Sequence, residues 1–369
     1  MSVPPPPRRR RRLLVALTLL AAVGLLVARA LLFQGPYQEI TDLPDRPIVD
    51  LHCHIAGIGA GDSGCFVSPA MRANFRFKIY LDAFDVTEAD LIEHGDMLVV
   101  RRLSELLARS RHVHQAVVLA MDGPIDASGE LARDRTEVYI PNDFVAAAVK
   151  HHTNLLFGAS VHPLRHDALE RLDKVVAQGA VLLKWLPSIM DIDPADPRLM
   201  PFYQRLAHHR LPLLTHTGGE RSFTTARDAL ADPLRLRLPL SLGVTVIAAH
   251  AGAGGENEGE SDFDRLRHLM REFPNLHADI SALTQVNRLG ALRDVLAAPE
   301  CRGRLVYGSD FPLINTALVS PWYHPLHIPL AERQKIADLD NPWDRDVQTK
   351  KSLGVPQEVF TLGESLLRR

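Results

Sequence analysis

The chain has little cysteine for its length. Cys53, Cys65 and Cys301 are the only cysteines in 369 residues, and no two of them form a CxxC pair. This excludes a framework of several disulfides, and it leaves the redox compartment of the protein open. Cys53 stands between two histidines, and on a strand it would face away from them as a buried, inert thiol.

The body of the chain also lacks a strong excess of either charge. The formal net charge is -2 at pH 7, and residues 8–12 place five arginines in one terminal block. The remainder is therefore mildly acidic, which argues against nucleic acid as a partner. There is no internal repeat and no low-complexity tract beyond residues 4–12, and the hydrophobic content of 46% is that of an ordinary globular protein.

An apolar run follows the arginines. Residues 13–33 contain few polar side chains, and a helix needs ~20 apolar residues to cross a bilayer. Because the arginines should stay in the cytoplasm, we expect a single-pass membrane anchor over residues 1–33. The catalytic domain would then be extracytoplasmic, in the periplasm or at the cell surface of a bacterium. The alternative is secretion after cleavage, since Ala28-Arg29-Ala30 fits a signal-peptide site.

The rest of the chain predicts a linker and one large domain. Residues 34–46 carry prolines and charges without periodicity, as linkers do. In residues 47–369, eight short apolar runs alternate with amphipathic segments. The runs are 48–52, 115–121, 155–161, 180–186, 212–216, 244–249, 275–280 and 305–307. Apolar runs without alternation are typical of parallel strands covered on both faces. We therefore expect an α/β fold, a (β/α)8 TIM barrel.

Two histidines, His52 and His54, end the first of these runs with a spacing of i, i+2. Successive side chains of a strand alternate between its faces, so this pair points the same way and can close on one metal ion. Later runs also end in residues that bind or serve a divalent metal. These residues are Lys184, His216, His250 and Asp310. Since TIM barrels carry their active sites at the carboxyl ends of the strands, we expect one site there, covered by the long connection at residues 56–87.

The motifs together resemble the amidohydrolase superfamily. They are His52-Cys53-His54, Thr215-His216-Thr217-Gly218, Ala249-His250-Ala251-Gly252 and Tyr307-Gly308-Ser309-Asp310-Phe311-Pro312. More narrowly, residues 47–369 are similar to the amidohydrolase-2 branch, which includes hydrolases and nonoxidative decarboxylases related to aminocarboxymuconate-semialdehyde decarboxylase. The resemblance implies that His52, His54 and His216 bind a divalent metal, most often zinc. Asp310 would be a further ligand that also handles protons, and His250 would be the acid/base residue.

The chemistry of these residue types agrees with such a site. Three neutral imidazoles and a carboxylate suit Zn²⁺, which lowers the pKa of water to about 7, and a nearby histidine can move a proton at neutral pH. We therefore expect a hydrolase with one zinc ion that uses a metal-activated water on a small molecule with a carbonyl, ester, lactone or amide. The alternatives are a decarboxylase or hydratase with the same site, and a noncatalytic metal-binding surface protein.

Three further residues have open roles. Lys184 is either carboxylated and bridges a second metal ion, or a cation that acts on the substrate or the site, or part of a structural salt bridge. Trp185 and Arg221 follow strand ends and are candidates for substrate contacts, with Arg221 acting either as a carboxylate clamp or in a surface salt bridge. The resemblance also implies a homodimer.

Overall fold

Eight parallel strands form the centre of the protein. The computed structural model describes residues 8–32 and 48–368, with side chains described for residues 13–29 of the first segment. The strands lie in the order β1-β3-β5-β6-β7-β8-β11-β12. Their bounds are β1 Ile48–His54, β3 Val113–Leu119, β5 Leu155–Ala159, β6 Leu182–Trp185, β7 Leu213–His216, β8 Val246–Ala249, β11 Leu276–Asp279 and β12 Leu305–Val306. Every predicted apolar run contains one of these strands or overlaps it.

The two outer strands of this sheet approach each other and nearly close the barrel. The backbone N–H of His54 donates to the carbonyl of Phe311 at 2.8 Å, and that of Asp310 donates to the carbonyl of His52 at 2.9 Å. These bonds join the end of β1 to the segment after β12. The predicted (β/α)8 TIM barrel is therefore confirmed.

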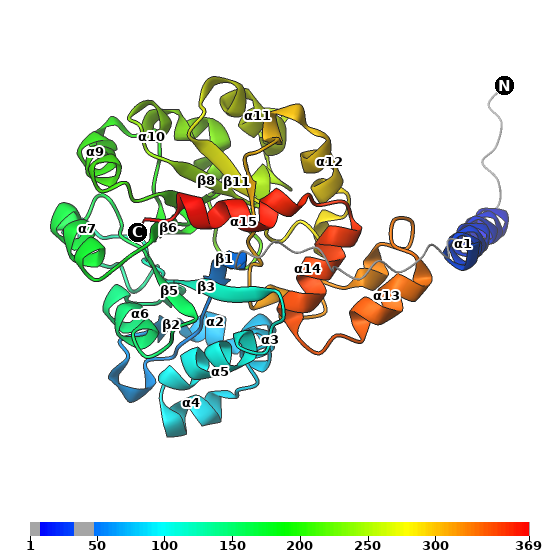
Figure 1. Ribbon diagram of the computed structural model, residues 1–369, viewed down its shortest axis with the longest axis horizontal. Helices are drawn as coiled ribbons and strands as arrows, with labels where there is room; N and C mark the ends of the chain where they lie inside the picture. Colours follow the sequence, from blue (N-terminus) through cyan, green and yellow to red (C-terminus); the bar gives the residue numbers. More distant parts are fainter. Residues whose placement is uncertain (1–7, 33–47, 369) are drawn as a thin grey trace.

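Helices surround the strands (Figure 1). Their bounds are α4 Glu88–His94, α5 Met97–Leu107, α6 Asn142–Val149, α7 Ala168–Ala177, α8 Pro187–Met190, α9 Met200–His209, α10 Arg237–Ser241, α11 Asp262–Glu272, α12 Ala291–Ala297, α13 Leu330–Ala337, α14 Pro342–Ser352 and α15 Gln357–Leu366. Helix α11 illustrates how the sequence sets them. The Ser261 side chain caps its first turn by accepting from the N–H of Asp264, and Leu266, Leu269 and Met270 form its buried stripe.

The barrel interior is filled by apolar side chains and closed at one end by α15. Inward-facing residues of six strands pack together; they are Val49, Leu51, Val117, Leu119, Leu182, Leu214, Ile247, Ala249 and Val306. Leu362, Leu366 and Leu367 of the C-terminal segment pack against this cluster. A Cβ at Gly363 would lie 2.9 Å from a Leu51 methyl carbon, so glycine allows α15 to approach β1. The filled end leaves only the carboxyl ends of the strands for a site.

The long connection after β1 lies over that open end, as predicted for residues 56–87. It forms α2 (Pro69–Ala73) and α3 (Phe75–Asp82), and its short strand β2 (Phe66–Val67) pairs with β4 (Val138–Tyr139). Each helix has a side-chain cap: Ser68 accepts from the N–H of Met71, and Asn74 accepts from that of Arg76. Both helices contribute side chains to the cavity at the barrel mouth.

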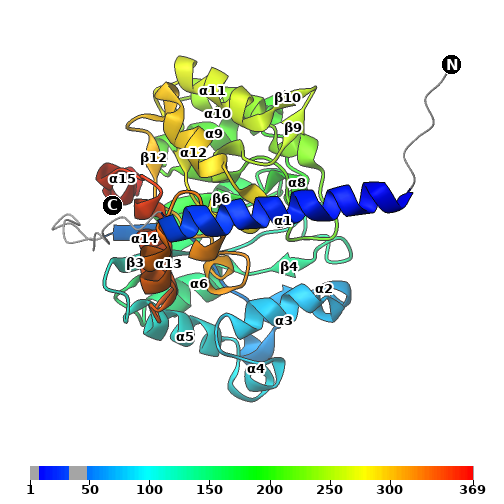
Figure 2. The ribbon, with the colours of Figure 1, turned by 90° about the vertical axis from the view of Figure 1, so that its right-hand side faces the viewer.

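The predicted membrane anchor is wrong. Helix α1 (Arg8–Leu32) lies to one side of the barrel (Figure 1 and Figure 2). Among the described residues, no helix combines the length and apolar character that a bilayer crossing requires. The extracytoplasmic location predicted from this anchor is therefore wrong as well. The predicted linker, residues 34–46, lies outside the described residues.

His162, in the loop after β5, makes stability depend on pH. Its buried ring accepts from the N–H of Leu164 at 3.2 Å and donates to the carbonyl of Met190 at 2.9 Å, which requires a neutral imidazole. Burial lowers the pKa of His162 to about 4, whereas in an unfolded chain a histidine titrates near 6.5. Between these pH values the unfolded chain binds the additional proton.

We therefore expect the free energy of unfolding to be highest above about pH 6.5 and to fall as the pH drops towards 4, with about 3 kcal/mol coming from His162. Urea unfolding at several pH values measures this dependence. His162→Gln should reduce the slope, whereas His151→Gln, at an exposed position, should leave it unchanged. An equal slope in wild type and His162→Gln would contradict the assignment.

Candidate functional site

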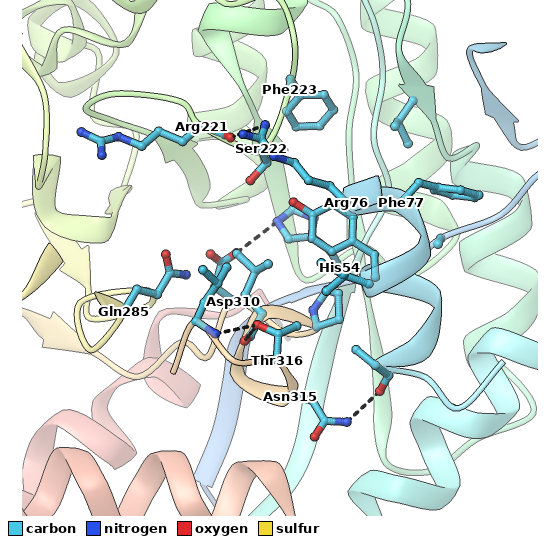
Figure 3. Close-up of a pocket in the computed structure, with 18 of the residues that line it drawn as sticks. His54, Arg76, Phe77, Arg221, Ser222, Phe223, Gln285, Asp310, Asn315 and Thr316 are labelled. Carbon is cyan, nitrogen blue, oxygen red and sulfur yellow. Dashed lines mark hydrogen bonds and ion pairs between the residues drawn. The ribbon is translucent and has the colours of Figure 1, made fainter. Parts of the chain in front are cut away.

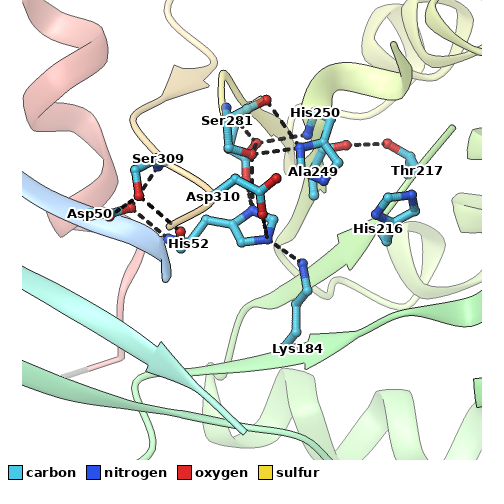
Figure 4. Close-up of polar contacts among 12 residues, drawn as sticks. Asp50, His52, Lys184, His216, Thr217, Ala249, His250, Ser281, Ser309 and Asp310 are labelled. Atoms are coloured by element: carbon cyan, nitrogen blue, oxygen red, sulfur yellow. Dashed lines mark hydrogen bonds and ion pairs between the residues drawn. The ribbon is translucent and has the colours of Figure 1, made fainter. Parts of the chain in front are cut away.

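The ionisable residues expected at the strand ends meet in one place (Figure 4). They are His52, His54, Lys184, His216, His250 and Asp310, and all six line a single cavity of about 720 Å³. His52 and His54 lie on β1, Lys184 on β6 and His216 on β7. His250 follows β8 directly, and Asp310 lies shortly after β12.

Three of these side chains direct ligand atoms towards one another. His52 Nε2 lies 3.1 Å from His54 Nε2, and Asp310 Oδ1 lies 3.5 and 3.7 Å from these two nitrogens. Two nitrogens at this separation subtend ~100° at an ion that is about 2.0–2.1 Å from each, which suits tetrahedral coordination. Burial lowers the pKa of both histidines well below 6.5, so each ring is neutral and offers a lone pair. This trio of His52, His54 and Asp310 fits one divalent ion.

The end of β1 is held in position by Asp50. A register shift between Asp50 and Cys53 interrupts the pairing of β1 with β3, and such irregularities re-aim side chains next to active sites. The buried Asp50 carboxylate accepts from the N–H of His52 at 3.0 Å, from that of Ser309 at 2.9 Å and from Trp343 Nε1 at 2.8 Å. The segments that carry His52 and Asp310 therefore share one anchor.

Asp279 orients His52 and was missed in the sequence. It is the last residue of β11, and its Oδ2 lies 2.8 Å from His52 Nδ1. With the Nδ1 proton donated to Asp279, the lone pair of His52 faces the trio through Nε2. The other carboxylate oxygen accepts from the N–H of His250 at 2.8 Å. An acid at the end of a predicted strand was the signal that could have revealed it.

Ser281 connects the same residues through its hydroxyl. Its Oγ lies 3.1 Å from His52 Nδ1 and 2.8 Å from His250 Nδ1, and it donates to Asp279 Oδ1. His52, His250 and Asp279 also form a group of the type that can hold a metal ion. Because hydrogen bonds already join these three residues, we assign them to support of the trio rather than to a second ion.

Lys184 reaches into the centre of the site. It is fully buried, and its Nζ lies 2.9 Å from His52 Nε2. Burial lowers the pKa of Lys184 to about 8, although the charges of Asp279 and Asp310 oppose the shift. Among the described residues Lys184 forms no ion pair within 4.0 Å, which favours a role in the site over a structural salt bridge.

His216 and His250 lie beside the trio. The His250 ring lies 5.0 Å from that of His52 and 5.0 Å from that of His216. His216 Nδ1 faces Glu220 Oε2 at 3.5 Å, and its buried Nε2 has no hydrogen-bond partner in the described part of the chain. His216 is therefore adjacent to the trio and not one of its members, and its Nε2 is open to a ligand.

The backbone at this rim is strained. His250 and Asp310 have φ angles of 59° and 65°, and a left-handed conformation of a residue other than glycine costs on the order of 1–3 kcal/mol. Hydrogen bonds from their backbone N–H groups, to Asp279 Oδ1 and to the carbonyl of His52, hold both residues in place. Strain of this kind is typical of functional sites.

Comparison with known families agrees with this geometry. The amidohydrolase family model (Amidohydro_2) matches residues 49–341. The chain belongs to the amidohydrolase-2 family. The predicted family is therefore confirmed. No match was found among curated protein sequences.

Several solved structures are similar to this amidohydrolase at low sequence identity. An uncharacterised TIM-barrel protein from Bordetella bronchiseptica has a TM-score of 0.51 and 15% identity, over 84% of this chain and 96% of that chain. A proposed 2-pyrone-4,6-dicarboxylic acid hydrolase from Pseudomonas putida has a TM-score of 0.47 and 15% identity, over 87% and 94%. The 5-carboxyvanillate decarboxylase from Sphingomonas paucimobilis has a TM-score of 0.44 and 14% identity, over 84% of this chain and 96% of that chain. The first of these supports the barrel fold.

Trp185 and Arg221, the two predicted substrate contacts of the amidohydrolase, lie away from the ligand trio. Trp185 is fully buried, donates from Nε1 to the carbonyl of Val161 at 2.8 Å and stacks on Phe202. It does not line the cavity, because its indole points into the layer between β6 and the helices. Arg221 is exposed at the cavity mouth, and its side chain runs away from His54 and Asp310 (Figure 3).

The lining of this amidohydrolase's cavity is of two kinds. Its apolar part comes largely from the connection after β1 and includes Met71, Phe77, Phe84, Leu186 and Phe223. Besides the ligand trio, its polar part includes Glu220, Gln285, Asn287 and Arg288. A molecule in the cavity would therefore meet both apolar and polar groups.

Asp279→Asn tests how the metal centre is built. An asparagine that turns its NH₂ group towards His52 Nδ1 cannot accept that proton, so we expect metal affinity to fall about 10–100-fold. Titration of metal-free protein against a chelator of known affinity measures the change. Asp294→Asn, at an exposed position, is the matched control and should bind as wild type does. Equal affinity in Asp279→Asn and wild type would remove Asp279 from this role.

Proposed function

We propose that this chain is a metal-dependent hydrolase that adds water to the carbonyl carbon of an ester, lactone, amide or related small molecule. The observation that carries the proposal is the convergence of His52 Nε2, His54 Nε2 and Asp310 Oδ1 at the wall of a cavity of about 720 Å³. A divalent ion held by these atoms would acidify a water molecule and polarise a carbonyl. Zn²⁺ suits this set of nitrogen and oxygen donors.

Asp310 is the residue that we assign to proton transfer. Burial raises the pKa of Asp310 to about 7, while the nearby charge of Lys184 opposes the shift. A carboxylate beside the position of the attacking water can accept a proton from it and return that proton to the leaving group. Its left-handed backbone and its bond to the carbonyl of His52 fix its position for both steps.

His250 is the second acid/base group in the proposal. Its Nδ1 contacts the Ser281 hydroxyl at 2.8 Å, its backbone is held by Asp279, and it lines the cavity. The ring is therefore fixed on one side and faces the cavity from beside the trio. We assign it to orientation of the carbonyl and to proton transfer, without a direct role in holding the ion.

One ion per chain fits the contacts better than two. The second group of ligand-type residues is satisfied by hydrogen bonds through Asp279 and Ser281. Lys184 Nζ lies at hydrogen-bond distance from His52 Nε2, in the manner of a cation that adjusts the charge of the site. A carboxylated Lys184 with a second ion is the alternative, which two metal equivalents per chain would reveal.

Two substitutions test this proposal on a panel of aryl esters, lactones and anilides. His250→Asn should retain the metal and lose turnover by about 10²–10⁴-fold, because it removes a proton-transfer group and no ligand. Asp310→Asn should lose both activity and metal affinity. His166→Asn, at an exposed position, should match wild type. Metal content by mass spectrometry and turnover by absorbance give the two readouts.

One result would contradict the hydrolase: metal-loaded wild type leaves every ester, lactone and amide intact while it releases CO₂ from carboxylated aromatics. A second result would contradict the role of His250 alone: if His250→Asn loses its metal together with its activity, His250 is a ligand.

A further inference from the structure

Two buried hydrogen-bond donors in the cavity have no acceptor. They are Nε2 of Gln285 and Nε of Arg288, and neither atom has a partner among the described residues. Gln285 is only 4% exposed, and both residues line the cavity that contains the trio. Figure 3 shows Gln285 and Asp310 among the residues that line this cavity. Buried donors are almost always satisfied in folded proteins, so two unpaired donors in one cavity point to a ligand that accepts from them.

The charge of Arg288 is also unbalanced. Within the described ranges it forms no ion pair, and its one hydrogen bond runs from Nη2 to the carbonyl of Gly219 at 3.4 Å. Burial lowers the pKa of Arg288, while Asp310 and Glu220 favour its charge from a greater distance. A desolvated guanidinium gains most from an anion that accepts two of its N–H groups.

The segment that carries both residues is held in place before any ligand binds. Gln285 and Arg288 flank one short turn, in which the N–H of Arg288 donates to the carbonyl of Gln285 at 2.9 Å. The N–H of Val286 donates to the carbonyl of Leu318 at 2.9 Å, and Gln285 pairs with Val319. The two donors are therefore fixed relative to the trio, which reduces the entropy lost on binding.

We propose that Gln285 and Arg288 form a subsite that binds a carboxylate of the substrate, separate from the carbonyl that is hydrolysed. The planar guanidinium and the amide NH₂ offer only donors, in the geometry that a carboxylate accepts. A singly charged group fits better than a phosphate, because Asp310 and Glu220 add negative charge nearby. This inference rests on the proposed hydrolase and names its substrate class.

The apolar lining of the cavity indicates the remainder of the substrate. Phe77, Phe84 and Phe223 line the cavity, and such surfaces favour aromatic or branched apolar groups. The substrate class is therefore an ester, lactone or amide with an apolar body and a free carboxylate. Arg221, the carboxylate clamp considered from the sequence, is exposed at the mouth. Among the described arginines that line the cavity, Arg288 is the one whose buried donor has no partner.

Calorimetric binding of benzoate and of the three benzenedicarboxylates to the metal-loaded protein tests the subsite without any turnover. One carboxylate of a benzenedicarboxylate can occupy the metal centre, so the second is free to bind Gln285 and Arg288. Benzoate has only the first of these groups. In wild type, the best dicarboxylate should bind at least about tenfold more tightly than benzoate. Arg288→Met and, independently, Gln285→Leu should bring the ratio of dicarboxylate affinity to benzoate affinity close to one. The affinity for benzoate and the metal content should stay unchanged. Arg288→Lys should retain part of the preference, because it keeps the charge and loses the planar fork.

Arg302→Met removes an exposed arginine at the opposite end of β12 and should leave the ratio unchanged. If both Arg288→Met and Gln285→Leu still bind the dicarboxylate more tightly than benzoate, by the wild-type ratio, the proposed subsite is contradicted. Tighter binding of 3-phosphonobenzoate than of any dicarboxylate, lost in Arg288→Met, would overturn the choice of a carboxylate. If the subsite binds as expected but the protein hydrolyses no ester, lactone or amide, the hydrolase fails and the subsite stands.

Discussion

The contact between His52 Nδ1 and Asp279 Oδ2, at 2.8 Å, is the interaction on which the site depends. It joins the end of β1 to the end of β11 through the barrel mouth. It also decides which nitrogen of His52 carries the proton, so that the Nε2 lone pair faces His54 and Asp310. Without this contact the histidine could rotate or exchange tautomers, and the three ligand atoms would no longer share one centre.

The barrel provides the conditions for that contact. Its interior is filled from the α15 end by strand side chains and leucines, so ionisable groups have room only at the carboxyl ends. The cost of burying them is offset by hydrogen bonds: Asp279 accepts from the Ser281 hydroxyl and from the backbone N–H of His250, and Asp50 accepts from the backbone N–H of His52. Burial shifts the pKa of Asp310 upward and that of Lys184 downward, towards values at which both can exchange protons near neutral pH.

Much of this arrangement could be predicted from the sequence, because it follows from strand periodicity. Eight apolar runs predict the barrel, and an i, i+2 histidine pair at the end of one run predicts the convergence of His52 and His54. Asp279 was missed although it ends a predicted strand in the same way as the histidine of the Leu213–His216 strand. Gln285 and Arg288 could not be found, since they lie in a loop whose course depends on long-range contacts with Leu318 and Val319. The membrane anchor was predicted from an apolar run alone and was wrong, because no described helix combines the length and the apolar character that a bilayer crossing requires.

The central claim is that His52, His54 and Asp310 hold one divalent ion. Crystals of the metal-loaded protein, measured on both sides of the zinc absorption edge, test it most directly. The account predicts one anomalous peak per chain, about 2.0–2.2 Å from His52 Nε2, His54 Nε2 and an oxygen of Asp310. A peak elsewhere in the barrel, or full metal occupancy with these three side chains turned away from it, would contradict the account.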